Sequence, residues 1–149
     1  MNYQTLPSWE ELPNLDLYLD QVLLYVNQTT AITPELVQKE LTASMVNNYV
    51  KHGYLKKPIK KKYQKEQIGR LIAISLLKNS FPIQTIAVVL ENLTSHYSSE
   101  QLYDAFVHYW NHKQTDNCSE IIILACQTVK HYYKTLSIVN TLQIKEENQ

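Results

Sequence analysis

The sequence predicts an all-α fold in which several helices pack as a single domain over residues 1–149. Only two of the 149 residues are glycine, so few positions suit the tight turns that a β-sheet needs. Apolar residues recur at three- and four-residue steps along most of the chain, as they do on one face of a helix. The hydrophobic share of 44% and the charged share of 19% are typical of globular proteins, and a chain of this length can bury about two thirds of its unfolded surface.

Capping and helix-breaking residues divide the first half of the chain. Ser8 and Glu11 have the spacing of a capping box, which predicts a short turn before Pro13. We expect helices from about Leu15 to Thr29, from Thr33-Pro34-Glu35 to about Glu40, and from Thr42 to about His52, where Gly53 ends the third. The first of these should pack inward through Tyr18, Leu19, Val22, Leu23 and Val26.

The second half is expected to be helical after an irregular segment. Residues 54–63 contain Pro58 and have no helical period, so they predict a strand or coil that forms a short wing. Helices should then run from about Gln64 to Lys78, with Gly69 permitting close approach of a neighbour, from Ile83 to Leu93, from a Ser98 cap to His112, and onward from an Asn117 cap. The last helix is apolar nearly all round at its start, which predicts a central position, and its tail from Lys145 should fray.

Charge is divided unevenly although the net charge is zero. Residues 1–50 have one lysine and six acidic residues, residues 51–78 have nine basic residues and one acidic residue, and residues 79–149 have four and seven. The net charges are therefore −5, +8 and −3. A concentrated positive block is typical of a polyanion site, whereas a run of lysines by itself is as often a solvated surface.

The helix predicted over residues 42–52 fits the recognition helix of a helix-turn-helix. With Met45, Val46, Tyr49 and Val50 buried, the outward strip consists of Ser44, Asn47, Asn48 and Lys51. Asparagine can pair with adenine and lysine can reach guanine, so these four are the candidate base-contacting residues. Phosphate contacts are expected from the residues that follow, namely Lys56, Lys57, Lys60, Lys61, Lys62, Tyr63 and Arg70.

The chain also resembles a known family. The stretch from Leu41 to Lys78, LTASMVNNYVKHGYLKKPIKKKYQKEQIGRLIAISLLK, and LPSWEELPNLDLYLDQV near the start resemble the bacterial domain-of-unknown-function family 1836. The same stretch is similar to the DNA-binding head of the MerR regulators, in which a recognition helix, a basic wing ending at a tyrosine and an amphipathic helix follow one another. This likeness implies a winged helix-turn-helix over about 32–78, followed by a C-terminal helical part over about 80–142.

Individual residues match the MerR pattern. Asn47, Asn48, Tyr49 and Lys51 correspond to its recognition helix, Gly53 to its terminating glycine, and Lys61 and Tyr63 to the basic-x-tyrosine end of its wing. Asn47 stands where an arginine is usual, and the glycine-centred hairpin is shortened to a Pro-Ile-Lys stretch. We therefore expect a transcriptional regulator that binds double-stranded DNA. We also expect a homodimer through the C-terminal helices, because palindromic sites favour two-fold proteins.

The sequence does not indicate a metal site or an enzyme active site. His108 and His112 have the spacing of a metal pair, but no acidic residue or cysteine completes a site nearby, so no metal is expected. The sequence contains no glycine-rich phosphate loop and no paired histidine and acid motif, which argues against an enzyme, and no cofactor is expected. Tyrosines of the C-terminal half could line a pocket for an unidentified small-molecule effector, although such residues are more often core.

The sequence also bears on the cellular location of the protein and on an alternative function. The acidic, proline-broken first twenty residues are unlike a secretory signal and no apolar run is long enough to span a membrane, so we expect a cytoplasmic protein with Cys118 and Cys126 reduced. The alternative to a DNA-binding regulator is a helical module that mediates protein interactions or senses a small molecule without binding DNA.

Overall fold

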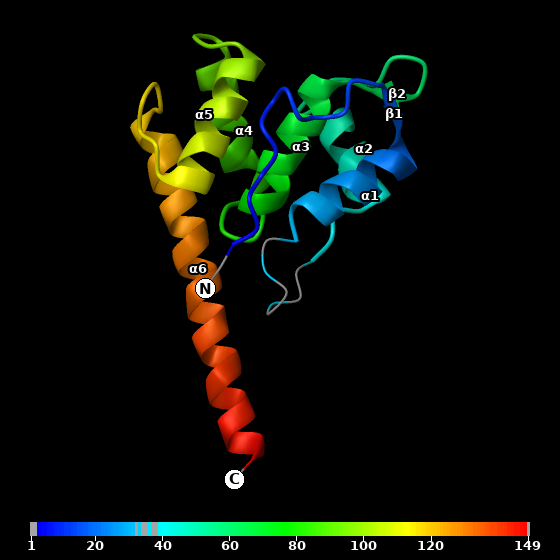
Figure 1. Cartoon of the computed structure of the whole chain (residues 1–149). Helices are drawn as coiled ribbons and strands as arrows, with labels where there is room; N and C mark the ends of the chain where they lie inside the picture. Colours follow the sequence, from blue (N-terminus) through cyan, green and yellow to red (C-terminus); the bar gives the residue numbers. More distant parts are fainter. Residues whose placement is uncertain (1–2, 32, 34–35, 37–38, 149) are drawn as a thin grey trace.

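The structure is a computed structural model that describes residues 3–31, 33, 36 and 39–148. Within these ranges the chain forms six helices and two short strands (Figure 1). The elements are β1 (Leu17–Tyr18), α1 (Leu19–Thr29), α2 (Ala43–Lys51), β2 (Lys62–Tyr63), α3 (Lys65–Leu77), α4 (Ile83–Thr94), α5 (Ser99–His112) and α6 (Glu120–Glu147). The prediction of a mainly helical fold is therefore confirmed.

Most helices begin where the capping residues predict. The hydroxyl of Thr42 accepts a hydrogen bond from the backbone N–H of Met45 at 3.2 Å, and Ser98 does the same for Gln101 at 3.2 Å. The turn at Ser8 is closed by Glu11, whose carboxylate accepts from the Ser8 N–H at 3.0 Å. These side chains satisfy N–H groups that a helix or turn otherwise leaves without an acceptor.

Two predicted helix ends were wrong for identifiable reasons. The first helix begins at Leu19 rather than Leu15, because Leu17 and Tyr18 pair antiparallel with Tyr63 and Lys62. Tyr18 consequently points outward and is 49% exposed. The last helix is preceded by Ser119 rather than Asn117, which has a positive φ of 57°, and it extends to Glu147.

The expected second helix, from Pro34 to Glu40, falls largely outside the described residues. Residues 34, 35, 37 and 38 are not described, and Leu36, Lys39 and Glu40 are not helical. In the described part of the chain, the helix that precedes α2 and packs against it is α1.

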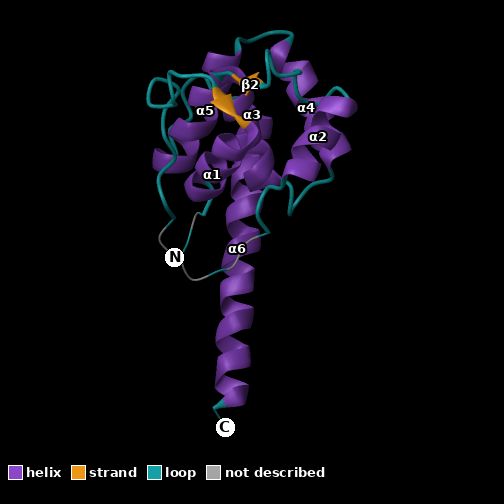
Figure 2. Ribbon diagram, turned by 90° about the vertical axis from the view of Figure 1, so that its right-hand side faces the viewer, coloured by secondary structure: helices purple, strands orange, loops and turns teal. Residues whose placement is uncertain are grey.

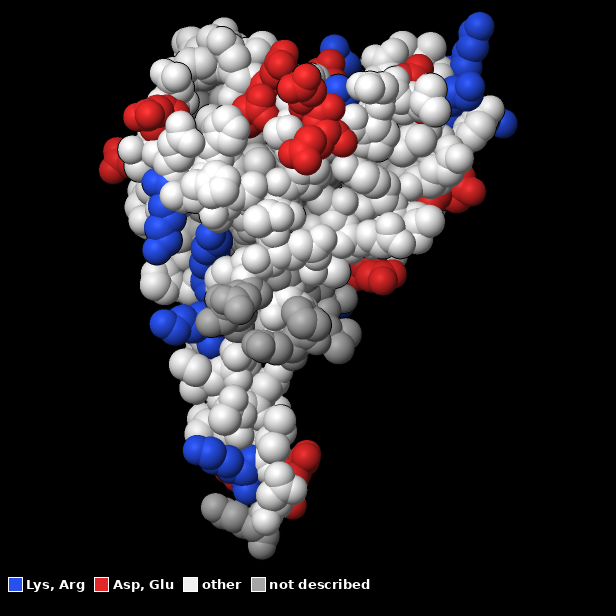
Figure 3. Space-filling model, viewed as in Figure 1, with Lys and Arg blue, Asp and Glu red and all other residues white. Residues whose placement is uncertain are grey.

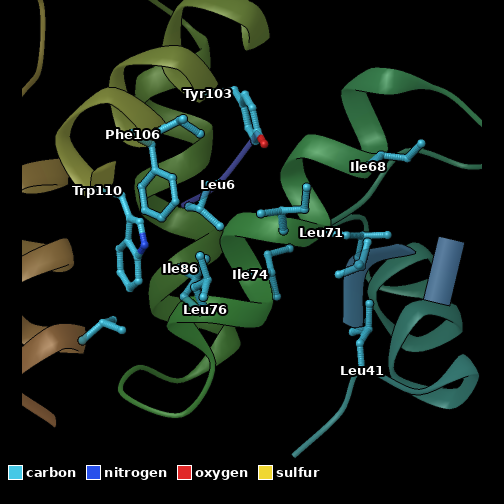
Figure 4. Close-up of a cluster of buried hydrophobic side chains, with 14 of the residues drawn as sticks. Leu6, Leu41, Ile68, Leu71, Ile74, Leu76, Ile86, Tyr103, Phe106 and Trp110 are labelled. Atoms are coloured by element: carbon cyan, nitrogen blue, oxygen red, sulfur yellow. The ribbon is translucent and has the colours of Figure 1, made fainter. Parts of the chain in front are cut away.

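Helix α3 forms the centre of the fold. Its side chains contact α1 on one side and α5, α4 and α6 on the other. In Figure 4, Phe106 and Trp110 of α5 lie on one side of α3 and Leu41 lies on the other. Its fully buried side chains, each at most 1% exposed, are Ile68, Leu71, Ile72, Ile74 and Leu76. An ideal Cβ at Gly69 would lie 3.1 Å from the Tyr103 ring, so this glycine does permit the predicted close approach.

The N-terminal segment crosses the outside of α3 and α5 as an extended arm (Figure 1). The backbone of Leu6 makes two hydrogen bonds with the side-chain amide of Asn111, at 2.8 and 2.9 Å. The Trp9 N–H donates to Asp104 at 2.9 Å, and the Tyr103 hydroxyl donates to the Pro7 carbonyl at 2.7 Å. Polar side chains of α5 therefore hold the arm in place.

Helix α6 packs on the body through its first half only and then extends away from it (Figures 1 and 2). Ile122, Cys126, Val129 and Tyr133 are buried, whereas Ile121 and Leu124 are 44% and 51% exposed. The prediction that the first turns are central was wrong, because only one face of them is covered. None of the helices in the described ranges has the length and apolar character required to cross a membrane.

Replacing Tyr103 tests the attachment of the arm. Burial raises the pKa of the Tyr103 phenol, so the neutral hydroxyl is favoured in the fold, and the resulting stability is present below pH about 10 and lost as the pH rises above it. We expect Tyr103→Phe to lower the free energy of unfolding by about 1 kcal/mol at neutral pH and to flatten the loss of stability above pH about 10. Urea denaturation across this pH range measures both effects.

The exposed Tyr97 supplies the control. Tyr97→Phe should leave the stability at neutral pH unchanged. Equal behaviour of the two variants would contradict the assigned role of the Tyr103 hydroxyl.

Candidate nucleic-acid interface

Helix α2 presents a polar strip on its outer face. Val46 and Tyr49 are buried, at 0% and 6% exposure, while Met45 and Val50 are partly buried. The side chains opposite them are all exposed, as the periodicity predicted, and are Ser44, Asn47, Asn48 and Lys51. The strip is about two turns long and is made of residue types that can read base edges.

Hydrogen bonds at both ends fix the position of α2. At its start, the side-chain amide of Asn27 in α1 donates to the Leu41 carbonyl at 3.0 Å and accepts from the Leu41 N–H at 2.8 Å. At its end, Gly53 has a φ of +77°, and the N–H groups of Tyr54 and Leu55 donate to the Tyr49 carbonyl. These hydrogen bonds fix the position of α2 relative to α1 at its start and relative to the wing at its end.

The wing, residues 54–63, ends in a tight turn. Ile59 and Lys62 exchange two backbone hydrogen bonds, at 3.0 and 2.9 Å, and Lys62 and Tyr63 then pair with β1. This confirms the predicted strand or coil. Lys60 and Lys61 lie at the tip of the turn, and both are exposed, as are Lys56 and Lys57. In Figure 3 basic side chains project from the upper right corner, where the wing lies in Figure 1.

The backbone of this turn is strained, because two lysines occupy the left-handed region. Lys60 and Lys61 have φ values of 51° and 67°, the arrangement of a type I′ turn, which strongly favours Asn-Gly. A left-handed conformation costs a residue with a Cβ about 1–2 kcal/mol. Residues held in such conformations cluster at functional sites.

Three of the predicted phosphate-contacting residues are placed differently from the exposed lysines. Lys62 is partly buried, with its ammonium 5.2 Å from the centre of the Tyr18 ring. Tyr63 is 3% exposed, and burial raises the pKa of its phenol. Arg70 donates from its guanidinium to the Tyr54 carbonyl at 3.1 Å, and burial lowers its pKa. The predicted phosphate contact of Tyr63 does not fit its burial, and Arg70 has a backbone partner in the wing.

Two polar side chains of α3 hold the wing against the core. The side-chain amide of Gln67, which is 5% exposed, donates to the carbonyls of Lys56 and Lys57 at 3.0 and 3.2 Å. Arg70 holds the Tyr54 carbonyl one turn further along. Sequence reasoning missed the roles of Asn27 and Gln67, and a polar residue beside the buried run at Ile68 was the only available signal for Gln67.

The remaining candidates do not gather into a reactive site. His108 is exposed on α5 with His112, and no group of three His, Cys, Asp or Glu side chains among the described residues is arranged to hold a metal ion. Cys126 is fully buried, which raises its thiol pKa to about 12, and partial burial raises the pKa of Cys118. Both thiols therefore stay protonated at neutral pH.

These features define a mainly helical protein with a polar helix face next to a strained basic turn. The chain belongs to the family described as a domain of unknown function, DUF1836, which matches residues 7–106. The matched region runs from the N-terminal arm through α4 and into α5, and ends before α6. No curated protein and no solved structure matches the chain.

Relieving the turn tests its strain. We expect Lys60→Asn with Lys61→Gly to raise the free energy of unfolding by about 1 kcal/mol, because asparagine and glycine adopt positive φ at lower cost. Lys56→Asn with Lys57→Gly makes the same change of charge where φ is not positive, so it should give no gain. Chemical denaturation compares the two, and a gain in the second variant alone or in both would contradict the strain.

Proposed function

We propose that this chain is a DNA-binding transcriptional regulator that reads bases with α2 and holds the phosphate backbone with the wing. The observation that carries the proposal is the strained turn, which presents Lys60 and Lys61 where Asn-Gly would be more stable. Ion pairing does not account for these lysines, because the pair between Lys56 and Glu66, at 3.5 Å, is the only one within the described ranges. A phosphate backbone is the partner that compensates such charge.

A MerR-like head is the finer part of the proposal. The order in the chain supports it: α1, then α2 with its polar face, the basic turn paired with β1, and the buried helix α3. In this arrangement α2 would enter the major groove while the wing contacts the adjacent backbone. Ser44, Asn47, Asn48 and Lys51 would contact bases, and Lys56, Lys57, Lys60 and Lys61 would contact phosphates.

Salt-dependent binding to mixed genomic duplex is the first test. With four phosphate contacts, affinity should fall roughly a hundredfold between about 50 and 200 mM salt. Lys60→Asn with Lys61→Gly should reduce the slope of log affinity against log salt by about two, and its improved stability excludes unfolding as the cause. Fluorescence anisotropy measures these slopes.

Lys134→Gln with Lys145→Gln removes the same charge from exposed positions of α6 and should leave the slope unchanged. Two results would contradict DNA binding: no binding of duplex at low salt, or the same salt slope for the wing variant and the α6 variant. The chain would then be an interaction module that does not bind DNA.

Base reading is a separate prediction. In a selection from random duplexes, the wild-type chain should enrich a defined site, and Asn47→Ala or Asn48→Ala should each relax preference at a base pair and cost about 1–3 kcal/mol on that site. Lys57→Ala should weaken all sequences alike, since a phosphate contact carries no sequence information. If Asn47→Ala and Asn48→Ala instead weaken binding to all sequences equally, these asparagines contact the phosphate backbone of the DNA rather than its bases.

The proposal includes a homodimer formed through α6. The described part of this helix exposes apolar residues beyond the body, and Tyr132, Val139 and Leu142 are spaced by seven and three, as in a coiled-coil seam. A helix of 28 residues is about 42 Å long, which is sufficient for a dimer contact. Two-fold symmetry would match a palindromic site.

Charge placed in the seam tests the dimer. Val139→Glu with Leu142→Glu should give monomers in sedimentation experiments at concentrations where the wild-type chain is a dimer. Asn140→Glu, on an adjacent exposed position, is the control and should remain dimeric. A monomeric wild-type chain at every concentration would contradict this part of the proposal.

A further inference from the structure

An apolar cavity of about 260 Å³ lies among α3, α4, α5 and α6. Its lining is almost entirely hydrocarbon, and includes Ala73, Leu77, Val89, Leu102, Phe106 and Ala125. Two of its lining residues, Ile86 and Phe106, are labelled in Figure 4. The volume lies between that of a roughly 150 Å³ cavity that binds benzene and the roughly 300 Å³ at which drug-sized pockets begin. The cavity therefore suits a short hydrocarbon group.

A polar hollow of about 360 Å³ lies beside the cavity, at the base of the wing. Glu66, Arg70, Thr94 and Ser99 line both spaces, so the hollow adjoins the cavity. The charged residues among the described lining of the hollow are Lys56, Arg70 and Glu66. Two cations and one anion leave an excess of one positive charge.

The donors of the hollow are available to an anion. The Arg70 guanidinium has five N–H donors, and the hydrogen bond it makes within the described chain uses Nη1 on the Tyr54 carbonyl. Lys56 is exposed, and its pair with Glu66 is a surface pair at 3.5 Å, which contributes little to stability. Both cations line the hollow and are therefore available to an incoming carboxylate.

From this geometry we infer that the cavity and the hollow together bind a single-chain amphiphile with an anionic head group. The hydrocarbon tail lies in the apolar cavity, and the head group lies against Arg70 and Lys56. A neutral hydrocarbon would leave the excess charge uncompensated, and a compact anion such as phosphate would leave the apolar cavity empty.

The position of the head group also assigns a regulatory role, which rests on the proposed function. Lys56 belongs both to the hollow and to the lysines proposed to hold phosphates. A Lys56 ammonium engaged by the ligand cannot contact DNA at the same time, so ligand and duplex weaken each other's binding by the same factor.

Calorimetric titration of the full chain with octanoate, compared with 1-octanol, tests the site. Octanoate should bind with one-to-one stoichiometry, and octanol, which has the same chain without the charge, at least tenfold more weakly. Ala125→Phe fills the cavity and should abolish binding, with circular dichroism verifying that the variant is folded. The absence of octanoate binding, or equal binding of octanol, would overturn the inference.

A matched pair of wing variants locates the head group without altering the core. Lys56→Gln should weaken octanoate binding at least threefold, while Lys57→Gln, the adjacent lysine that does not line the hollow, should have no effect on it. Equal effects of the two variants would place the head group elsewhere and overturn the assignment.

Anisotropy with duplex DNA tests the regulatory role separately. Saturating octanoate should lower the salt slope of duplex binding by about one, as the loss of one phosphate contact does. An unchanged slope would overturn the regulatory role alone. If the chain binds octanoate but never binds duplex, the proposed function fails and the regulatory role fails with it, whereas the ligand site stands on the calorimetry.

Discussion

Burial of α3 between α1 on one side and α4, α5 and α6 on the other is the constraint on which the rest of the structure depends. A helix whose side chains at Ile68, Leu71 and Ile72 are fully enclosed has a single orientation in the core. Its first two turns also contain Gln67 and Arg70, which bind the backbone of the wing. The position of the basic turn therefore follows from the packing of the core.

The same helix joins the two surfaces that the structure makes available for binding. Its outer residues Glu66 and Arg70 line the hollow beside the cavity, and its packing against α1 fixes the connection to α2 through Asn27. The tip of the wing differs from this core because Lys60 and Lys61 are exposed, strained and of like charge. A segment of that kind is stabilised when an anionic partner binds it, which is the physical basis of the proposed function.

Local signals predicted much of the fold. Thr42 and Ser98 cap their helices as expected, and the periodicity of α2 separates Val46 and Tyr49 from the exposed polar strip. These features depend on neighbours within one or two turns, so they can be read from the chain directly. The uneven distribution of charge along the sequence likewise predicts the basic segment, residues 51–78, that contains the wing.

Long-range contacts account for what could not be predicted. The pairing of Leu17 with Tyr63 shortens α1 and buries the tyrosine, and no local pattern joins residues so far apart. Arg70 has the composition of a phosphate contact, yet the proximity of the Tyr54 carbonyl gives it a structural role. The cavity depends on four helices at once, so its existence follows only from the assembled fold.

The most direct measurement of the central claim is amide hydrogen exchange of the full chain with and without duplex DNA at low salt. The account predicts that DNA slows exchange in residues 43–52 and in the wing, with α4 and the exposed half of α6 little changed. Slowed exchange confined to α4, α5 and α6, or no change in α2 and the wing despite bound duplex, would contradict the assignment of this surface.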